Sequence, residues 1–222
     1  MFHDAALVAG KDLRVELRSK VTLQQVAPFA VLMLILFGVA LDPDRGVLRR
    51  ASSGLFWVAV LFCALLAIQR AFTIESADGG RDALRLSGLD PAGIFLGKAA
   101  AIAVQLIGLE IVLAAGVIVM YGTEVTGWPL LAATCAAATV GLAAAGTLYG
   151  VLAAGLRVRE TLLPILLLPV LSPVLIGATK AFEAALGGAP ADGWPWCGLL
   201  VIFALLYVAA GTLAFGPLLE ES

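Results

Sequence analysis

The sequence predicts an all-α, polytopic membrane protein with six transmembrane helices, on the basis of its composition and the spacing of its charges. Hydrophobic residues make up 61% of the 222 residues and charged residues only 14%, which leaves too little polar surface to cover a water-soluble protein. The charges separate six largely apolar stretches of about 20 residues or more, the length that a helix needs to cross a bilayer core about 30 Å thick. These stretches are apolar on every side, whereas the strands of a transmembrane barrel alternate apolar and polar residues.

The expected spans follow from the gaps between charged residues and divide a single transmembrane domain of residues 1–222. The fourth uncharged stretch is longer than one span needs. Its helix is expected to begin near Trp128, with Pro129 in the first turn, where a missing backbone N–H does no harm. The six expected spans are about residues 21–41, 51–71, 97–121, 128–155, 161–180 and 194–217.

The segment before the first span has the pattern of an amphipathic helix. At 100° per residue its apolar residues gather on one side and its bases on another. Such a helix can lie in the membrane interface with its apolar stripe against lipid. The alternative is a charge cluster that only orients the first span. The apolar stripe comprises Ala6, Ala9, Leu13 and Leu17, and the basic side comprises Lys11, Arg14 and Arg18.

The distribution of Lys and Arg predicts that both termini are cytoplasmic, because positively charged flanks resist translocation. With the N-terminus inside, ten of the 14 basic residues fall on the cytoplasmic side and four fall outside. The loops at 42–51 and 180–193 are then outside, although the first of them carries three of the four outer bases. The inner residues are Lys11, Arg14, Arg18, Lys20, Arg70, Arg81, Arg85, Lys98, Arg157 and Arg159, and the outer ones are Arg45, Arg49, Arg50 and Lys180.

Several functions are excluded by what the sequence contains. A net charge of -2 provides no basic excess for binding nucleic acid. His3 is the only histidine, so the chain alone offers no paired axial haem ligands, no zinc cluster and no Ser/His/Asp triad. The segment from Gly93 to Lys98 has three residues between its glycines and is followed by Ala99 where a P-loop has Ser or Thr. We therefore expect this chain alone to have no catalytic activity and to bind no metal, cofactor or ATP.

Glu110 lies near the middle of the third expected span. A carboxyl group at that depth costs a few kcal/mol, so it should face protein or a wet cavity. It can line a substrate path or relay a proton, or it can be a packed structural group. Gly146 and Gly150 form a G-x-x-x-G motif, as do Gly93 and Gly97, and this spacing permits close helix contact, within the chain or in a homodimer.

The longest expected cytoplasmic loop runs from Arg70 to Lys98. It mixes acidic and basic residues, is interrupted by glycines, and contains a possible short amphipathic helix at 82–86. Asp90 and Pro91 mark a turn into the third span. A compact helix at this place suits docking to a partner protein, whereas the alternative is an ordinary solvated loop.

Several stretches of the chain resemble the CcmB family of cytochrome c maturation subunits, known as haem exporter protein B. The opening LRVELR at 13–18 is similar to the family's basic start, and GLFWVAVLFCALLA at 54–67 is similar to its second span. LLLPVLSPVLIGATKA at 166–181 is close to a late family pattern, and the likeness extends from about residue 11 to about residue 210. Arg81 and Gly88 in the cytoplasmic loop, and Glu110 in the third span, depart from the family pattern. The matching residues of the loop are Arg70, Phe72, Glu75, Asp78, Gly79, Asp82, Leu84, Leu86 and Lys98.

The resemblance implies a multi-pass permease subunit of an ABC-type complex in a bacterial inner membrane. Its expected partners are the ATPase subunit CcmA, the subunits CcmC and CcmD, and the haem chaperone CcmE, besides membrane lipid. ATP is then bound by the partner ATPase, and haem is handled by the complex. The loop between the second and third spans would act as a coupling helix, and the residues implied in this role are Glu75, Asp78, Gly79, Asp82, Leu84 and Leu86.

Two aspects of function stay open at this stage. ATP hydrolysis can drive haem delivery, or it can drive release of the haem-loaded chaperone from the complex. The chain can also be an export-type ABC permease for another small molecule or lipid, or a proton-coupled carrier built around Glu110. The absence of a detectable inverted repeat disfavours the carrier.

Overall fold

The computed structural model describes residues 1–19, 22–41, 45–77, 88–154 and 159–221, and within these ranges the chain is almost entirely helical. A short π-helical segment, η1 (Thr22–Val26), precedes the first span. The helices are α1 (Phe2–Ser19), α2 (Ala27–Leu41), α3 (Arg45–Ala77), α5 (Pro91–Tyr121), α6 (Trp128–Ala154), α7 (Arg159–Leu186) and α8 (Pro190–Glu221).

Six of these helical segments are long and apolar enough to cross a membrane. They are Gln24–Leu41, Gly46–Thr73, Pro91–Tyr121, Trp128–Ala153, Leu162–Leu186 and Pro190–Leu218. The predicted all-α fold with six spans after an N-terminal helix is therefore confirmed. The short helix predicted at 82–86 lies outside the described residues.

Several helices extend beyond the ends expected from the charges. α3 begins at Arg45 rather than near residue 51, and α5 begins at Pro91 rather than near 97. α7 continues through Lys180 to Leu186, and most of the expected loop at 180–193 is helical. Within α7, Lys180 pairs with Glu183 one turn later at 3.0 Å. A charged residue thus limits the apolar part of a span but does not end the helix, because its side chain reaches the polar interface from a helical backbone.

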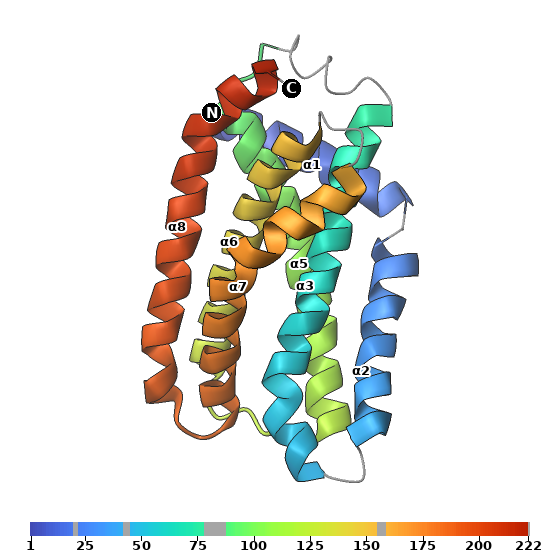
Figure 1. Ribbon diagram of the computed structural model, residues 1–222, viewed down its shortest axis with the longest axis vertical. Helices are drawn as coiled ribbons and strands as arrows, with labels where there is room; N and C mark the ends of the chain where they lie inside the picture. Colours follow the sequence, from blue (N-terminus) through green and yellow to red (C-terminus); the bar gives the residue numbers. More distant parts are fainter. Residues whose placement is uncertain (20–21, 42–44, 78–87, 155–158, 222) are drawn as a thin grey trace.

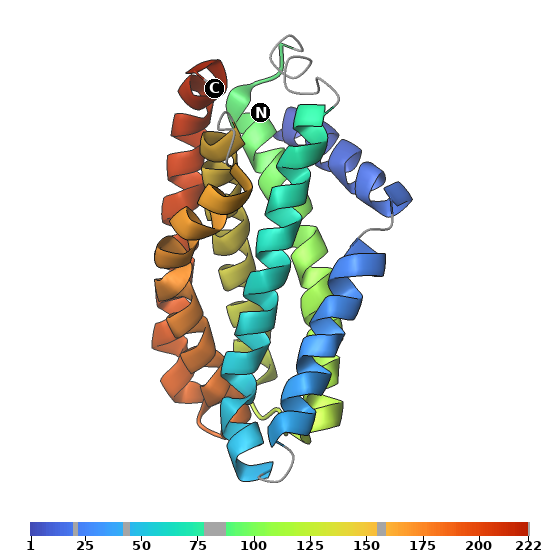
Figure 2. The ribbon, with the colours of Figure 1, turned by 45° about the vertical axis from the view of Figure 1, so that its right-hand side comes forward.

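The six spanning helices form an antiparallel bundle with both termini at one end (Figure 1). α5 packs against α1, α2, α3, α6 and α8, whereas α3 and α6 are the most buried of the spanning helices. α1 lies across the end that carries the termini, and α2 starts below its C-terminal end (Figure 2). Side chains on α8 such as Ile202, Leu205 and Leu213 are exposed, which is the arrangement expected of a helix that faces lipid tails.

Small residues and aromatic rings fill the interior of the bundle. The ring of Phe56 on α3 stacks on Phe182 of α7 at 4.6 Å, and Trp57 meets Phe182 edge to face at 6.3 Å. At Gly146 and Gly150 of α6, an added Cβ would collide with the side chains of Ile68 and Phe72 on α3. This G-x-x-x-G motif therefore faces a helix of the same chain.

Both ends of α5 have the features that typically end a helix. Asp90 caps α5 by accepting a hydrogen bond from the backbone N–H of Ala92 at 3.1 Å, with Pro91 in the first helical position. This arrangement confirms the turn predicted before the third span. At the other end, Gly122 ends α5 with φ of 59°, a conformation that favours glycine.

Candidate functional site

The predicted coupling residues lie at or beyond the end of α3. Glu75 belongs to the last turn of α3, whereas Asp78, Gly79, Asp82, Leu84 and Leu86 lie outside the described residues. The structure does describe the two helical stems that flank this segment. Arg70 and Phe72 lie on the α3 stem, and Asp90 and Lys98 lie on the α5 stem.

Acidic residues of α1 bind basic residues on both stems. Arg70 pairs with the Glu16 carboxylate at 3.1 Å and donates a second hydrogen bond to the Ser19 hydroxyl at 2.9 Å. Lys98 on α5 is only 3% exposed, and its Nζ lies 3.7 Å from the Asp12 carboxylate. Both ion pairs are partly or largely shielded from water, so breaking either one is costly. α1 thereby fixes the end of α3 relative to the start of α5.

An aromatic contact completes this cluster. The Lys98 ammonium group lies 5.4 Å from the centre of the Phe72 ring, within the range of a cation–π interaction. Phe72 itself packs against Gly150 of α6. The cluster of Asp12, Glu16, Arg70, Phe72 and Lys98, here called the stem cluster, therefore connects α1, α3 and α5 and reaches α6.

Two glycines let the backbone of α1 approach α5 closely. A Cβ at Gly93 would lie 2.8 Å from the backbone oxygen of Met1, and one at Gly97 would lie 2.7 Å from that of Ala5. These distances are shorter than atomic contact allows, so only glycine fits. The second predicted G-x-x-x-G motif, Gly93 and Gly97, is thus the part of α5 against which α1 packs.

Glu110 is buried at the interface between α5 and α6, with 4% of its surface exposed. One of its carboxyl oxygens accepts a hydrogen bond from the Thr139 hydroxyl. The Cys135 thiol, one helical turn before Thr139, lies beside the same carboxyl group. The other oxygen, Oε2, has no hydrogen-bond partner among the described residues. The side chain therefore faces protein, as expected of a carboxyl group at bilayer depth.

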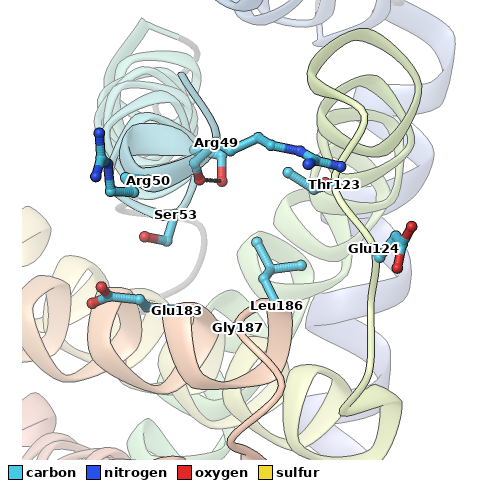
Figure 3. A pocket seen from close by; sticks show the side chains of 9 residues that line it. Arg49, Arg50, Ser53, Thr123, Glu124, Glu183, Leu186 and Gly187 are labelled. Atoms are coloured by element: carbon cyan, nitrogen blue, oxygen red, sulfur yellow. Dashed lines mark hydrogen bonds between the residues drawn. The ribbon is translucent and has the colours of Figure 1, made fainter. Parts of the chain in front are cut away.

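A cavity of about 400 Å³ opens at the end of the bundle opposite the termini. It lies between the start of α3, the loop after α5 and the end of α7, as Figure 3 shows. Arg49 crosses its upper side and donates to the backbone oxygen of Gly122 at 3.0 Å. Ser53 is 3% exposed and faces the opening, whereas the carboxylate of Glu124 points away from it.

Sequence reasoning missed this cavity. In the sequence, Arg49 and Arg50 stand out only as exceptions to the charge distribution. Nothing in the sequence pairs Arg49 with Gly122, which lies 73 positions later. Its lining contains two arginines and two glutamates, so the formal charges of the lining residues balance. Among the described residues, no three His, Cys, Asp or Glu side chains are placed to hold a metal ion.

These features define a multi-pass helical membrane protein whose N-terminal helix is bound to one end of its bundle. The family described as "CcmB protein" matches residues 4–222. The chain belongs to the CcmB family.

The relatives most useful for comparison are all called heme exporter protein B. The protein from Haemophilus influenzae is 31% identical over 205 residues, which cover 92% of this chain and 90% of the relative. The Escherichia coli K12 protein is 33% identical over 229 residues, with 93% and 90% covered, and the Pseudomonas aeruginosa protein is 30% identical over 202 residues, with 90% of each covered. The similarity therefore extends over nearly the whole of both chains.

Proposed function

We propose that this chain is the membrane permease subunit of an ABC-type complex for c-type cytochrome biogenesis. It couples ATP hydrolysis by a partner ATPase, CcmA, to haem delivery or to release of the haem-loaded chaperone CcmE. Membership of the CcmB family over residues 4–222 is the observation that carries the proposal. The name heme exporter protein B, shared by the relatives, supports haem as the molecule that the complex handles.

The proposal places the end with α1 and the termini in the cytoplasm of a bacterium, at its inner membrane. The excess of Lys and Arg at that end supports this orientation. The ATPase then docks at the segment between α3 and α5, with Leu84 and Leu86 as apolar anchors and Glu75, Asp78 and Asp82 fixing the register around Gly79. CcmC and CcmD are the further partners, and ATP is bound and hydrolysed on the ATPase rather than on this chain.

The stem cluster supports a mechanical role for this end of the bundle. A segment that transmits force needs stems that do not move independently, since motion is otherwise absorbed locally. Arg70 and Lys98 hold the two stems to one helix through ion pairs at 3.1 and 3.7 Å. A movement imposed between residues 78 and 87 is therefore passed to α3 and α5 together.

An export-type permease for another small molecule or lipid would share this architecture. The match to the CcmB family over nearly the whole chain favours cytochrome c biogenesis. A proton-coupled carrier built around Glu110 would work without an ATPase. Loss of the ATPase from the complex would therefore leave the carrier active, whereas it would inactivate either kind of permease.

The test is a substitution in the proposed coupling segment, made in the full complex. Leu84→Asp should abolish co-purification of the ATPase and cytochrome c maturation while membrane insertion stays normal, because truncating an interface anchor typically costs about 2 kcal/mol or more. Asp90→Ala is the matched control and should be milder, since it removes a helix cap, worth about 1 kcal/mol, and an exposed ion pair with the Met1 ammonium group at 3.6 Å. If Leu84→Asp inserts normally and keeps both the partner and wild-type maturation, the segment is only a connector.

A further inference from the structure

The outer surface of α1 differs in charge from its inner surface. Asp12 and Glu16 face the bundle in the stem cluster. Arg14 and Arg18 lie on the exposed side and have no ion pair with any residue that the structure describes. Lys11 is also exposed and contacts Asp12 at 3.0 Å. Docking of α1 therefore leaves an outward surface whose uncompensated charge is positive.

These basic side chains surround a groove of about 380 Å³. No acidic residue contributes to its lining, which includes the small residues Ala6 and Gly10. A Cβ added at Gly10 would meet nothing within 4 Å, so this part of the groove is open. The lining residues are Ala6, Leu7, Gly10, Lys11, Arg14, Val15 and Arg18.

The groove adjoins the apolar side of the helix. Ala6 belongs both to the groove and to the apolar stripe predicted from the sequence, and Leu17 in that stripe is 75% exposed. Leu7, an apolar wall of the groove, is 53% exposed. α1 crosses the end of the bundle above the start of the first span (Figure 2), where an amphipathic helix is expected to lie at the level of the lipid headgroups. α1 thus presents three sides, of which one binds the bundle, one is apolar and one is basic.

We propose that this groove binds the phosphate headgroup of an anionic phospholipid. Arg14 and Arg18 donate hydrogen bonds to the phosphate oxygens, and Lys11 adds a point charge. The glycerol and the first acyl carbons lie against Leu7 and the apolar stripe. The seating of α1 on Gly97 and in the stem cluster fixes the groove in advance, so lipid binding does not have to order the helix.

A phosphate-bearing lipid complements this groove better than a polar anion in water does. A polar anion would gain nothing from exposed Leu7 and Leu17, whereas a lipid presents both a phosphate for the basic side of α1 and an apolar chain for its apolar side. Basic residues beside a membrane attract anionic lipid by an amount equivalent to about a fivefold gain in binding per charge. Two arginines therefore predict a preference for anionic over zwitterionic lipid that is large enough to measure.

The experiment is lipid titration of the purified full-length chain in neutral detergent, followed by native mass spectrometry. We expect phosphatidylglycerol to bind more tightly than phosphatidylcholine, and Arg14→Gln with Arg18→Gln to weaken phosphatidylglycerol alone by about 25-fold. Gly10→Leu should also weaken it without any change of charge, because the new side chain fills the groove. Lys180→Gln removes one exposed positive charge at the other end of the bundle and should leave binding unchanged.

Three outcomes would overturn the proposal. Equal loss of binding in Lys180→Gln and in an Arg14→Gln single variant would mean nonspecific attraction. Saturation by inorganic phosphate at the same affinity as the lipid would identify a site for free phosphate. Unchanged lipid selectivity in the double variant, together with loss of ATPase co-purification from the complex, would make this surface a protein interface. Arg14→Lys with Arg18→Lys, which keeps the charge, controls for misfolding and should retain most of the selectivity.

Discussion

The environment of Glu110 shows how one buried carboxyl group can be accommodated in a spanning helix. Its bond to Thr139 joins α5 to α6, and its remaining oxygen has no partner among the described residues. An unpaired polar atom inside a protein costs about 1–3 kcal/mol. Glu110 is therefore hydrogen-bonded to one neighbouring helix, but that helix provides a hydrogen bond for only one of its two carboxyl oxygens.

We expect Glu110→Gln to preserve membrane insertion and thermal unfolding, because the amide keeps the size of the side chain and can bond to the Thr139 hydroxyl. Glu110→Ala should lower the free energy of unfolding by about 2 kcal/mol, since it leaves a cavity and an unpaired hydroxyl. Thermal unfolding in detergent and a cytochrome c maturation assay check both variants. Loss of maturation in Glu110→Gln, with unfolding unchanged, would instead assign the carboxyl group a role in function.

Gly97 illustrates a residue whose importance depends on one close approach. A side chain at this position would meet the Ala5 oxygen and Val8 of α1. Gly108, on the same helix, has nothing within 4 Å of an added Cβ. The two positions therefore form a matched pair on α5.

Gly97→Leu should displace α1 and lower the stability of the protein by about 1–3 kcal/mol, the usual cost of overpacking. Gly108→Leu should be neutral or slightly stabilising, because leucine favours a helix over glycine by about 1 kcal/mol. Thermal unfolding and protease accessibility of α1 provide the measurement. Equal effects of the two substitutions would show that α1 is not seated on Gly97.

At the scale of elements, α1 is where sequence and structure differ most. The sequence predicts a helix with an apolar and a basic side, and both sides are present. It does not predict that a third stripe, with Val8, Asp12 and Glu16, binds the bundle. Acids on a helix near a membrane usually indicate a solvated face, and their partners here lie 54 and 86 positions away in the chain. Such pairing depends on how α3 and α5 are rotated, which periodicity within α1 does not encode.

Exchange of the charges between Glu16 and Arg70 tests the docking of α1. Arg70→Glu alone brings a third carboxylate close to those of Glu16 and Asp12. It should lower the free energy of unfolding by about 2–4 kcal/mol. Glu16→Arg alone should act in the same direction. The double variant Glu16→Arg with Arg70→Glu should recover at least half of this loss in thermal unfolding, because the pair is restored in reverse. Strictly additive losses would contradict the direct ion pair.

The ends of the spans were only partly predictable for a related reason. The gaps between charged residues place Lys98 and Lys180 at the limits of the expected spans, but both lie within helices. Lys98 is accommodated by Asp12 and the Phe72 ring, and Lys180 by Glu183. The number of spans follows from the apolar stretches alone, whereas the length of each helix depends on partners that fold beside its charged ends.

At the scale of the whole molecule, an even number of spans places both termini and the stem cluster at one end, and the cavity beside Arg49 and Ser53 at the other. Coupling to an ATPase requires the end with α1 to face the cytoplasm, where an ATPase has access to ATP. The reversed orientation would leave the segment between α3 and α5 outside the cell and would exclude such coupling.

Labelling of single cysteines with a membrane-impermeant maleimide tests this requirement most directly. The reporters are Glu124→Cys and His3→Cys, which are exposed at opposite ends of the bundle, each in a chain with Cys63, Cys135 and Cys197 replaced by alanine. The account predicts that Glu124→Cys reacts in intact spheroplasts, whereas His3→Cys reacts only after the membrane is permeabilised. Reaction of His3→Cys in intact spheroplasts, with Glu124→Cys protected until permeabilisation, would contradict the proposed coupling to a cytoplasmic ATPase.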